Sequence, residues 1–308
     1  MALKFDRDFE PRTGAAVEVA PGVRRVTAPN AGPFTFHGTN TFLIGRDPLA
    51  ILDPGPADPA HLDALIYAIG SARVGHILVS HTHRDHSPGA RLLQARTDAP
   101  ILAAGPHRPA RPARPGEELR LDASADLEFS PDEALADGGM VEGPGYRLEA
   151  VATPGHTGNH LAFALAGTDI LFSGDHVMGW STTVVAPPDG AMADYMASLD
   201  RLLERPESRY LPAHGGPIGN AHAYVRALRA HRKMREGALP SARRPVGPRA
   251  RHARLPGARP AARRCRGAVD ARASRGSRGA GNCRRRWPAD PRSTLPGRGD
   301  RARIGLKN

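Results

Sequence analysis

Cysteine is absent from the first 240 of the 308 residues, and the two cysteines of the chain, Cys265 and Cys283, lie near its end. The first 240 residues therefore use neither disulfides nor thiolate metal ligands. No run approaches the ~18 apolar residues of a membrane-spanning helix, and the opening stretch MALKFDRDFEPRTG lacks the apolar segment of a secretory signal. We expect a soluble cytoplasmic protein without a membrane partner.

Acidic residues are scarce at the end of the chain, and this imbalance produces the formal net charge of +12. Residues 241–308 carry 20 Lys and Arg against three Asp and Glu, whereas residues 1–240 carry 23 against 28. The first part is therefore mildly acidic, and the basic character belongs to the tail. Arginine-rich segments can bind RNA, so nucleic-acid binding through the tail is an open alternative.

Apolar residues are scarce in the same tail, where seven of 68 positions are Val, Leu, Ile or Trp. Ala, Gly, Pro and Arg fill 47 of these positions. Such a segment cannot bury enough apolar surface to offset the entropy lost on ordering, so we expect residues 241–308 to be disordered. All four residue types have codons that begin with two G or C bases, so an out-of-frame reading of a GC-rich gene is an alternative origin.

Residues 1–240 show the patterns of one folded domain in which short apolar strands alternate with helices. Apolar runs predict strands over residues 22–28, 39–45, 48–55, 74–80, 100–105, 146–155, 160–167, 168–175 and 210–216. Helical periodicity predicts helices over residues 58–70, 87–96, 191–205 and 220–239, the second with Ser87 as its cap. Two mixed sheets with helices outside would bury these apolar faces, which predicts an α/β sandwich.

Four side chains that can bind metal gather in one short stretch, SHTHRDHSPG, at residues 80–89. His81 and His83 point the same way on an extended backbone, whereas Asp85 and His86 lie beyond a turn and can reach a second point. Imidazole nitrogen and carboxylate oxygen suit Zn²⁺, and also Mn²⁺ or Fe²⁺ where oxygen ligands dominate. One loop after a buried strand can therefore begin two adjacent metal sites.

Each site needs further ligands, and three later strand ends supply candidates beside glycine. They are His156 in TPGHTGNH, Asp175 in FSGDHV and His214 in LPAHGG. Each follows an apolar strand, so the fold can bring them to one edge of the sheets. This repeated order of strand, small residues and potential ligand carries more weight than any single histidine.

The stretch HTHRDH matches the HxHxDH signature of the metallo-β-lactamase fold superfamily, and ILDPG, TPGHT, SGD and PAHG stand in that family's order. The chain resembles the family over about residues 20–235. The resemblance implies an αββα four-layer sandwich with a dinuclear metal site along one edge of its two sheets. It further implies His81, His83 and His156 on the first metal, Asp85, His86 and His214 on the second, and Asp175 as the bridge.

Other polar residues near these motifs are expected to support the site. Asp53 in ILDPG matches a family carboxylate that usually buttresses the ligand loop. His160 and His176 are expected to pack or hydrogen-bond beside the ligands. Residues after Asp175 are candidates either for the substrate pocket or for packing at the sandwich edge: Trp180, Thr182, Thr183 and Tyr195. The histidines without a ligand context are expected at the surface or in packing roles: His37, His61, His76, His107, His222, His231 and His252.

Two metals joined by a carboxylate usually share a water, whose pKa they lower toward neutrality. The same ions can stabilise the charge that develops on a carbonyl or phosphoryl oxygen. We therefore expect a hydrolase with two Zn²⁺ ions, with Mn²⁺ or Fe²⁺ as alternatives, and a bridging hydroxide as nucleophile. Asp175 and Asp85 are the expected catalytic carboxylates, with Asp85 also taking up or relaying a proton.

The substrate separates the branches of this family. The stretches GTNTFLIG, GDHVMGWSTTVV and YLPAHGGPI look similar to the β-lactamase-like endoribonucleases, which implies single-stranded RNA as substrate. That group normally ends in a winged-helix-like domain, and here residues 241–308 stand in its place. A frameshift would explain this departure.

A small-molecule ester or thioester is the alternative substrate. Glyoxalase II-like hydroxyacylglutathione thioesterases share every metal ligand, but this chain lacks their glycine–cysteine–glycine–arginine stretch after the bridging aspartate. Secreted zinc β-lactamases place a cysteine in the second site, which is missing here. A non-catalytic binding module is the remaining alternative, although all seven ligand positions are filled.

Overall fold

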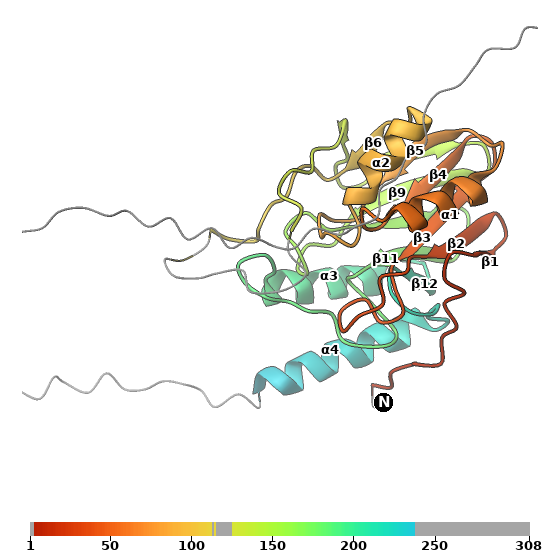
Figure 1. Ribbon diagram of the computed structural model, residues 1–308. Helices are drawn as coiled ribbons and strands as arrows, with labels where there is room; N and C mark the ends of the chain where they lie inside the picture. The colour runs from red at the N-terminus through yellow and green to blue at the C-terminus, as the bar shows by residue number, and fades with distance from the viewer. Residues whose placement is uncertain (1–2, 113, 115–124, 238–308) are drawn as a thin grey trace, which may run out of the picture. The chain divides into compact units, whose positions relative to one another are not determined.

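The computed structural model describes residues 3–112, 114 and 125–237, and these form two β-sheets packed face to face (Figure 1). The first sheet has seven strands in sequence order. Its first four strands pair antiparallel, and the remaining pairs are parallel. The strands are β1 (Ala16–Ala20), β2 (Val23–Thr27), β3 (Asn40–Gly45), β4 (Leu49–Leu52), β5 (Val74–Leu78), β6 (Ile101–Ala103) and β7 (Glu133–Ala134).

The second sheet has five strands in the order β12-β11-β10-β9-β8. The outer pair, β11 and β12, is parallel, and the other neighbours are antiparallel. The strands are β8 (Met140–Gly143), β9 (Tyr146–Ala152), β10 (Leu161–Leu165), β11 (Ile170–Gly174) and β12 (Arg209–Pro212). Both sheets are therefore mixed, as the sequence predicts.

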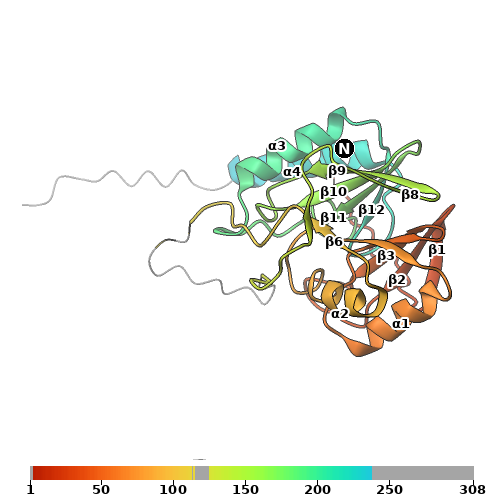
Figure 2. The same ribbon diagram turned by 90° about the horizontal axis from the view of Figure 1, so that it is seen from above.

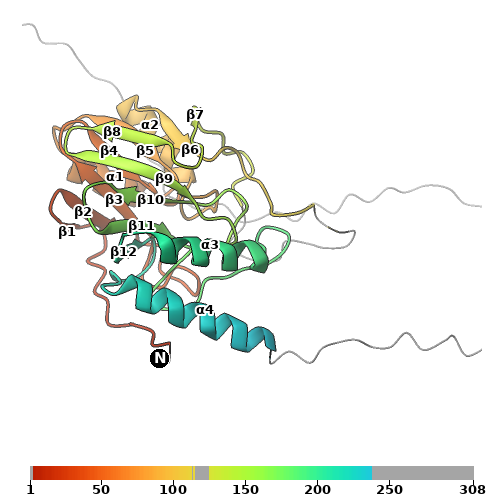
Figure 3. The same cartoon turned by 180° about the vertical axis from the view of Figure 1, so that it is seen from behind.

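Helices cover the outer face of each sheet, which Figure 2 shows from above and Figure 3 from behind. The first sheet carries α1 (Pro59–Ile69) and α2 (Pro88–Thr97), whereas the second carries α3 (Met192–Glu204) and α4 (Ala221–Gly237). The layers follow the order helix, sheet, sheet, helix, so the predicted αββα sandwich is confirmed.

Three apolar cores hold these layers together. Between the sheets, the rings of Phe42 and Phe172 lie 5.0 Å apart in the middle core. Leu65 of α1 and Leu93 of α2 are buried against the first sheet, and Leu199 of α3 is buried against the second. Each helix therefore buries its apolar stripe on a sheet, which is where an amphipathic helix gains most of its stability.

The first two helices differ in how their N-termini are capped. The Asp58 carboxylate accepts a hydrogen bond from the His61 backbone N–H at 3.0 Å and caps α1 as its sequence indicates. Ser87 occupies the N-cap position of α2 as predicted, but its side chain makes no capping hydrogen bond. Its hydroxyl donates instead to the Asp126 carboxylate at 2.9 Å, because this position also belongs to the turn that carries the ligands.

The strand ends place the predicted ligands, since β5, β9, β11 and β12 lead into the loops that hold them. The short strands β1, β7 and β8 are additions that apolar runs do not predict. The predicted disorder of residues 241–308 and the domain boundary at residue 240 fall outside the described residues and stay predictions. Among the described residues, no helix is long and apolar enough to cross a membrane.

Candidate metal centre

The loop that leaves β5 carries four of the predicted ligands. The backbone N–H groups of His86 and Ser87 both donate to the carbonyl of His83, at 2.9 and 3.1 Å, so the chain turns sharply there. A Cβ at Gly89 would lie 2.5 Å from the Pro54 carbonyl oxygen. Only glycine therefore lets this turn pack against the neighbouring loop, and the packing fixes the direction of the ligands.

Three histidines form the first ligand group. The Nδ1 atom of His83 lies 3.0 Å from Nε2 of His81 and 3.0 Å from Nε2 of His156. The three rings are buried and stand nearly perpendicular to one another. The structure thus brings one nitrogen from each ring to a common point, as a metal ion would require.

Asp85, His86 and His214 form the second group. Oδ2 of Asp85 lies 3.3 Å from Nε2 of His86 and 3.2 Å from Nε2 of His214. All three reach this point from different directions, since His214 follows β12 in the other sheet. These atoms also lie close enough together to share one ion.

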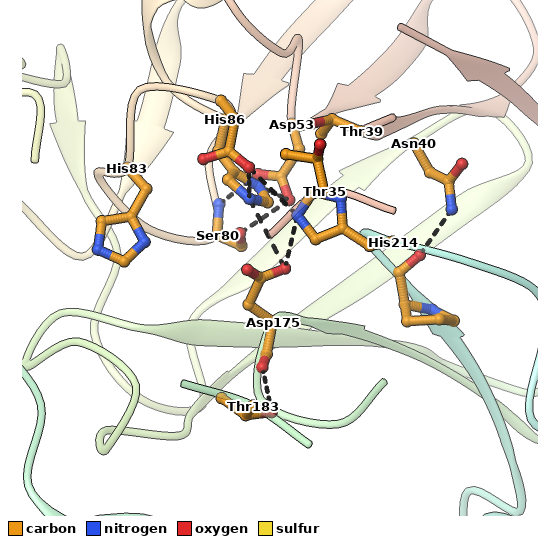
Figure 4. Close-up of polar contacts among 12 residues, drawn as sticks. Thr35, Thr39, Asn40, Asp53, Ser80, His83, His86, Asp175, Thr183 and His214 are labelled. Carbon is orange, nitrogen blue, oxygen red and sulfur yellow. Dashed lines mark hydrogen bonds and ion pairs between the residues drawn. The ribbon is translucent and has the colours of Figure 1, made fainter. Parts of the chain in front are cut away.

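Asp175 lies between the two groups. Its Oδ1 atom is 3.2 Å from Nε2 of His214 and 3.6 Å from Nε2 of His86, whereas its Oδ2 atom is 3.6 Å from Nε2 of His156. In Figure 4 the carboxylate faces His86 and His214, while the hydroxyl of Thr183 contacts its backbone. One oxygen for each group is the placement that the predicted bridging role needs.

The outward nitrogens of two ligands meet backbone carbonyls. His156 Nδ1 lies 2.6 Å from the Val184 oxygen, and His214 Nδ1 lies 3.2 Å from the Gly38 oxygen. A carbonyl can only accept, so each Nδ1 carries a proton, and in the neutral ring the Nε2 atom then has its lone pair toward the centre. Backbone geometry therefore sets both imidazoles in the form that binds metal.

Asp53 and Ser80 set two more histidines in the same form. The hydroxyl proton of Ser80 goes to Asp53 Oδ2 at 2.7 Å, so its oxygen accepts from His81 Nδ1 at 3.0 Å. His86 Nδ1 lies 3.2 Å from the same Asp53 oxygen. The structure thus places Asp53 directly behind the ligand loop, where the sequence predicts a supporting carboxylate.

The atoms that face the centre are left without ordinary partners. Although carboxylates lie nearby, no hydrogen bond of normal geometry reaches His86 Nε2, His214 Nε2 or Asp175 Oδ1, all of which are buried. Buried polar atoms of this kind need an explanation, because an unpaired group costs free energy. Convergent lone pairs and two carboxylates fit divalent cations, so the residues present fit a metal centre.

Charge within the second group strengthens this fit. Burial would lower the pKa of His214, but the charges of Asp175 and Asp85 raise it to about 10. Burial also opposes the charge of Asp85, yet the neighbouring histidines hold its pKa well below the usual value. On the other side, burial and the nearby histidines lower the pKa of His156 to about 4. The carboxylates therefore attract positive charge to the centre, while His156 stays neutral.

Several residues expected near the ligands lie behind them. The Nε2 atom of His160 accepts from the Asp175 backbone N–H at 3.2 Å, so this ring supports the bridging residue. Thr183 and Tyr195, two of the candidates for the pocket, are buried behind it instead. Their hydroxyls donate to the backbone carbonyl of His176 at 3.0 Å, which corresponds to the packing alternative.

A pocket opens beside the ligands, and Trp180 and Thr182, the other two candidates for the pocket, line it. Most other lining residues outside the ligand groups are apolar. They come from the β2–β3 connection and from the segment after β11: Pro33, Phe34, Met178, Val184 and Ala186. Four of the predicted ligands therefore help to line an otherwise mostly apolar cavity: His83, Asp85, His156 and Asp175.

Two residues of the site have no signal in the sequence. The Asp189 carboxylate lines the pocket and lies 3.2 Å from His83 Nε2 through Oδ2 and 2.9 Å from His107 Nε2 through Oδ1. Burial would raise the pKa of Asp189, but the hydrogen bond from His83 and the charge of His107 lower it. Both residues stand in proline-rich stretches without a strand or helix pattern, so only the folded chain brings them together.

Comparison with protein families assigns the chain to a superfamily. A family model described as the metallo-beta-lactamase superfamily matches residues 34–214, more than half of the chain. The chain belongs to this superfamily. The five sequence motifs, the αββα sandwich and the clustered ligands agree with the assignment, and they identify the superfamily member as a metal-dependent hydrolase.

Curated relatives in this superfamily include a thioesterase. The chain is 27% identical to an atrochrysone carboxyl ACP thioesterase of Claviceps purpurea, over 76% of this chain and 69% of the relative. It is 32% identical to a beta-lactamase-like protein 2 homolog of Caenorhabditis elegans, over 71% and 70% of the two chains. The chain therefore spans about two thirds of the length of these relatives.

Solved structures of the superfamily share the fold. A beta-lactamase domain protein from Burkholderia ambifaria aligns with a TM-score of 0.60 and 25% identity, over 76% of this chain and 77% of that one. A family protein from Thermus thermophilus aligns with a TM-score of 0.59 and 25% identity, over 72% and 83%. These similarities support the fold and the family, and they do not name a substrate.

Proposed function

We propose that this chain is a dinuclear metal-dependent hydrolase that cleaves carboxylic thioesters or esters with an apolar acyl group. The observation that carries the proposal is the apolar pocket directly above the ligand groups. Its apolar walls would bind a hydrocarbon or aromatic acyl group, and the ionisable side chains among its described lining residues are those of His83, His156 and the three aspartates Asp85, Asp175 and Asp189.

Two divalent ions fit the two ligand groups. His81, His83 and His156 would hold the first, Asp85, His86 and His214 the second, and Asp175 would contact both. Mixed nitrogen and oxygen donors favour Zn²⁺, with Mn²⁺ or Fe²⁺ as alternatives. When bound, such ions lower the pKa of a coordinated water and polarise a carbonyl oxygen, which makes hydrolysis accessible near neutral pH.

The chain's own residues orient the substrate and handle protons. Hydrolysis of a thioester forms a bond from carbon to a water oxygen, breaks the carbon–sulfur bond, and delivers one water proton to the departing thiolate. The Asp85 side chain is 20% exposed, against 9% for Asp175, and it lines the pocket. We assign the proton relay to Asp85, because its carboxylate is the more exposed of the two and lines the pocket.

The pocket favours an acyl substrate over RNA. A strand of RNA presents several phosphates, and proteins neutralise them with lysine and arginine side chains. Among the described residues that line the pocket, none is Lys or Arg. The endoribonuclease interpretation of the sequence therefore has less support than its alternative, a thioesterase.

Relatives of the chain support the same choice. Four relatives between 27% and 31% identical are named as atrochrysone carboxyl ACP thioesterases. Their names give a thioester bond as the target of those relatives. We take the thioester, rather than a particular acyl group, as the substrate class.

A side-by-side assay tests the proposal. Zn²⁺-loaded protein would be given an apolar acyl thioester, single-stranded RNA and a phosphodiester dye under the same conditions. We expect turnover of the thioester with kcat/KM well above that for the other two. Cleavage of RNA alone would contradict the proposed substrate class, and no turnover of any of the three would favour a binding module.

A further inference from the structure

His83 differs from the other four histidine ligands in the nitrogen that it turns toward the centre. His81, His86, His156 and His214 present Nε2, whereas His83 presents Nδ1. Its outward atom is therefore Nε2, which lies 3.2 Å from Asp189 Oδ2. For Nδ1 to keep a free lone pair, the proton of a neutral ring must be on Nε2, and an ionised carboxylate there can only accept.

Asp189 is held in place by its second oxygen and by its backbone. Its Oδ1 atom lies 2.9 Å from His107 Nε2, and His107 Nδ1 lies 2.9 Å from Thr82 Oγ1. Thr82 in turn accepts from Asn159 Nδ2 at 3.0 Å. This row of buried contacts ties Asp189 to the loops on both sides of the first ligand group.

The segment around Asp189 also packs tightly against the loop that carries His156. A Cβ at Gly190 would lie 2.5 Å from the Gly155 carbonyl oxygen and 2.7 Å from the His156 carbonyl oxygen. The Ala191 N–H donates to the Gly155 carbonyl at 3.0 Å. Close backbone approach leaves this segment little room to move, so the carboxylate is presented at a fixed position.

We infer that Asp189 is the positioning residue of the first metal site, which makes His83 present Nδ1, with His107 holding the carboxylate in register. This inference rests on the proposed function, since it concerns one of the two proposed ion sites. Asp189 and Asp53 then play matching roles, because Asp53 holds the outward nitrogen of His86 in the second group. Carboxylates behind ligating histidines commonly improve metal affinity by about 10- to 100-fold.

The first test reads the tautomer of His83 in metal-free protein, by long-range nitrogen–proton NMR of ¹⁵N-histidine-labelled chains at mildly alkaline pH. The His83 signals are identified by their loss in a His83→Gln variant. We expect the Nε2–H form in the wild type and a shift toward Nδ1–H in Asp189→Ala. Asp189→Leu, which fills the space without an acceptor, should show the same shift as Asp189→Ala. Asp189→Asn should retain the Nε2–H form, because its amide oxygen can still accept.

The second test measures Zn²⁺ affinity by competition with a chromophoric chelator, and needs no turnover. Asp189→Ala should weaken one of the two Zn²⁺ equivalents about 10- to 100-fold and leave the other unchanged. Asp53→Asn should weaken both equivalents, because Asp53 supports His86 directly and His81 through Ser80. Asp63→Asn, a change of an exposed aspartate on α1, should alter neither.

The outcomes separate this inference from the proposed function. An unchanged His83 tautomer in both Asp189→Ala and Asp189→Leu overturns the inference, whatever happens to Zn²⁺ affinity. Unchanged affinity for both equivalents in these variants overturns it as well. Absence of Zn²⁺ binding by the wild type would instead overturn the proposed function, and this result is visible without any Asp189 variant.

Discussion

At the scale of single residues, the metal centre depends on the partner of each imidazole's outward nitrogen. Two ligands face backbone carbonyls, one faces a serine hydroxyl, and His83 and His86 face carboxylates. Each partner accepts the outward N–H of its ring, so each of the five rings, when neutral, turns a lone pair inward. Asp175 then adds negative charge between the groups, and its two oxygens reach both.

Replacing Asp175 by asparagine should therefore abolish function without unfolding the protein. The change keeps the shape of the side chain and removes the charge that both ion sites share. We expect kcat/KM for the thioester to fall at least about 100-fold, and Zn²⁺ affinity to fall with it. Steady-state kinetics and circular dichroism would check both points. Asp63→Asn makes the same chemical change on an exposed face of α1, and it should keep full activity.

The sequence predicts the ligands better than it predicts their supports. Four of the ligands lie within six consecutive positions, and this local density is visible in the sequence itself: His81, His83, Asp85 and His86. Asp189 and His107 each stand alone in proline-rich stretches, and they meet only because two loops fold onto the same sheet edge. A contact between residues 82 positions apart leaves no local pattern, so it requires the structure.

At the scale of elements, α2 anchors the ligand loop because it begins directly after it. Leu93 of α2 is fully buried in the core under the first sheet, whereas its neighbour Leu92 is 37% exposed. The pair offers a matched test of how far this packing holds the loop. The buried residue should carry most of the stabilisation, since burial rather than helix propensity stabilises such helices.

Leu93→Ala should lower the free energy of unfolding by about 2–5 kcal/mol, because it removes buried methyl groups and leaves a cavity. Leu92→Ala should change it by no more than about 0.5 kcal/mol, as expected for a surface position. Urea unfolding of metal-free protein measures both values. Equal effects of the two substitutions would show that α2 does not pack as described.

The connection between β2 and β3 forms one wall of the pocket and is fastened by an aromatic stack. The rings of Phe36 and Trp180 lie 4.8 Å apart and 8° from parallel. Phe36 has a φ of 56°, a left-handed conformation that is strained for this residue type. We infer that the stack with Trp180 helps to hold this conformation and keeps Phe34 of the same segment at the pocket.

Trp180→Ala should therefore weaken binding of the apolar acyl group. Loss of a stacking contact worth about 0.5–1.5 kcal/mol should raise KM about 3- to 10-fold, with a smaller change in kcat. Trp180→Phe retains a stacking ring and should stay near the wild type. Steady-state kinetics with thioesters of two acyl sizes would measure this, and an unchanged KM in Trp180→Ala would remove Trp180 from the binding wall.

Element prediction succeeds where strands are buried and fails where they are exposed. The strands β10 and β11 are buried along their whole length, so their apolar runs are clear in the sequence. In β1 and β8 a single residue each, Ala20 and Val141, is fully buried, so no apolar run marks them. They are held by pairing with β2 and β9, which is tertiary information.

At the scale of the whole molecule, the three apolar cores draw on residues between Ala20 and Leu228. All seven proposed ligands, Asp53 and Asp189 lie within the same span. The folded unit and its site should therefore not depend on the basic tail that the sequence predicts after residue 240.

A chain shortened to residues 1–240 should keep the melting temperature and the thioesterase kcat/KM of the full chain. The reason is that every core and site side chain described above lies before residue 240. Thermal unfolding and kinetics on both chains would check this. A shortened chain that folds but loses activity would place part of the site after residue 240.

Metal content measured together with activity tests the central claim most directly. Protein stripped by a chelator and reloaded stepwise with Zn²⁺ should bind two ions per chain, and thioester hydrolysis should return as the second ion binds. Thioester hydrolysis that survives complete removal of the metal would contradict a dinuclear metal-dependent hydrolase.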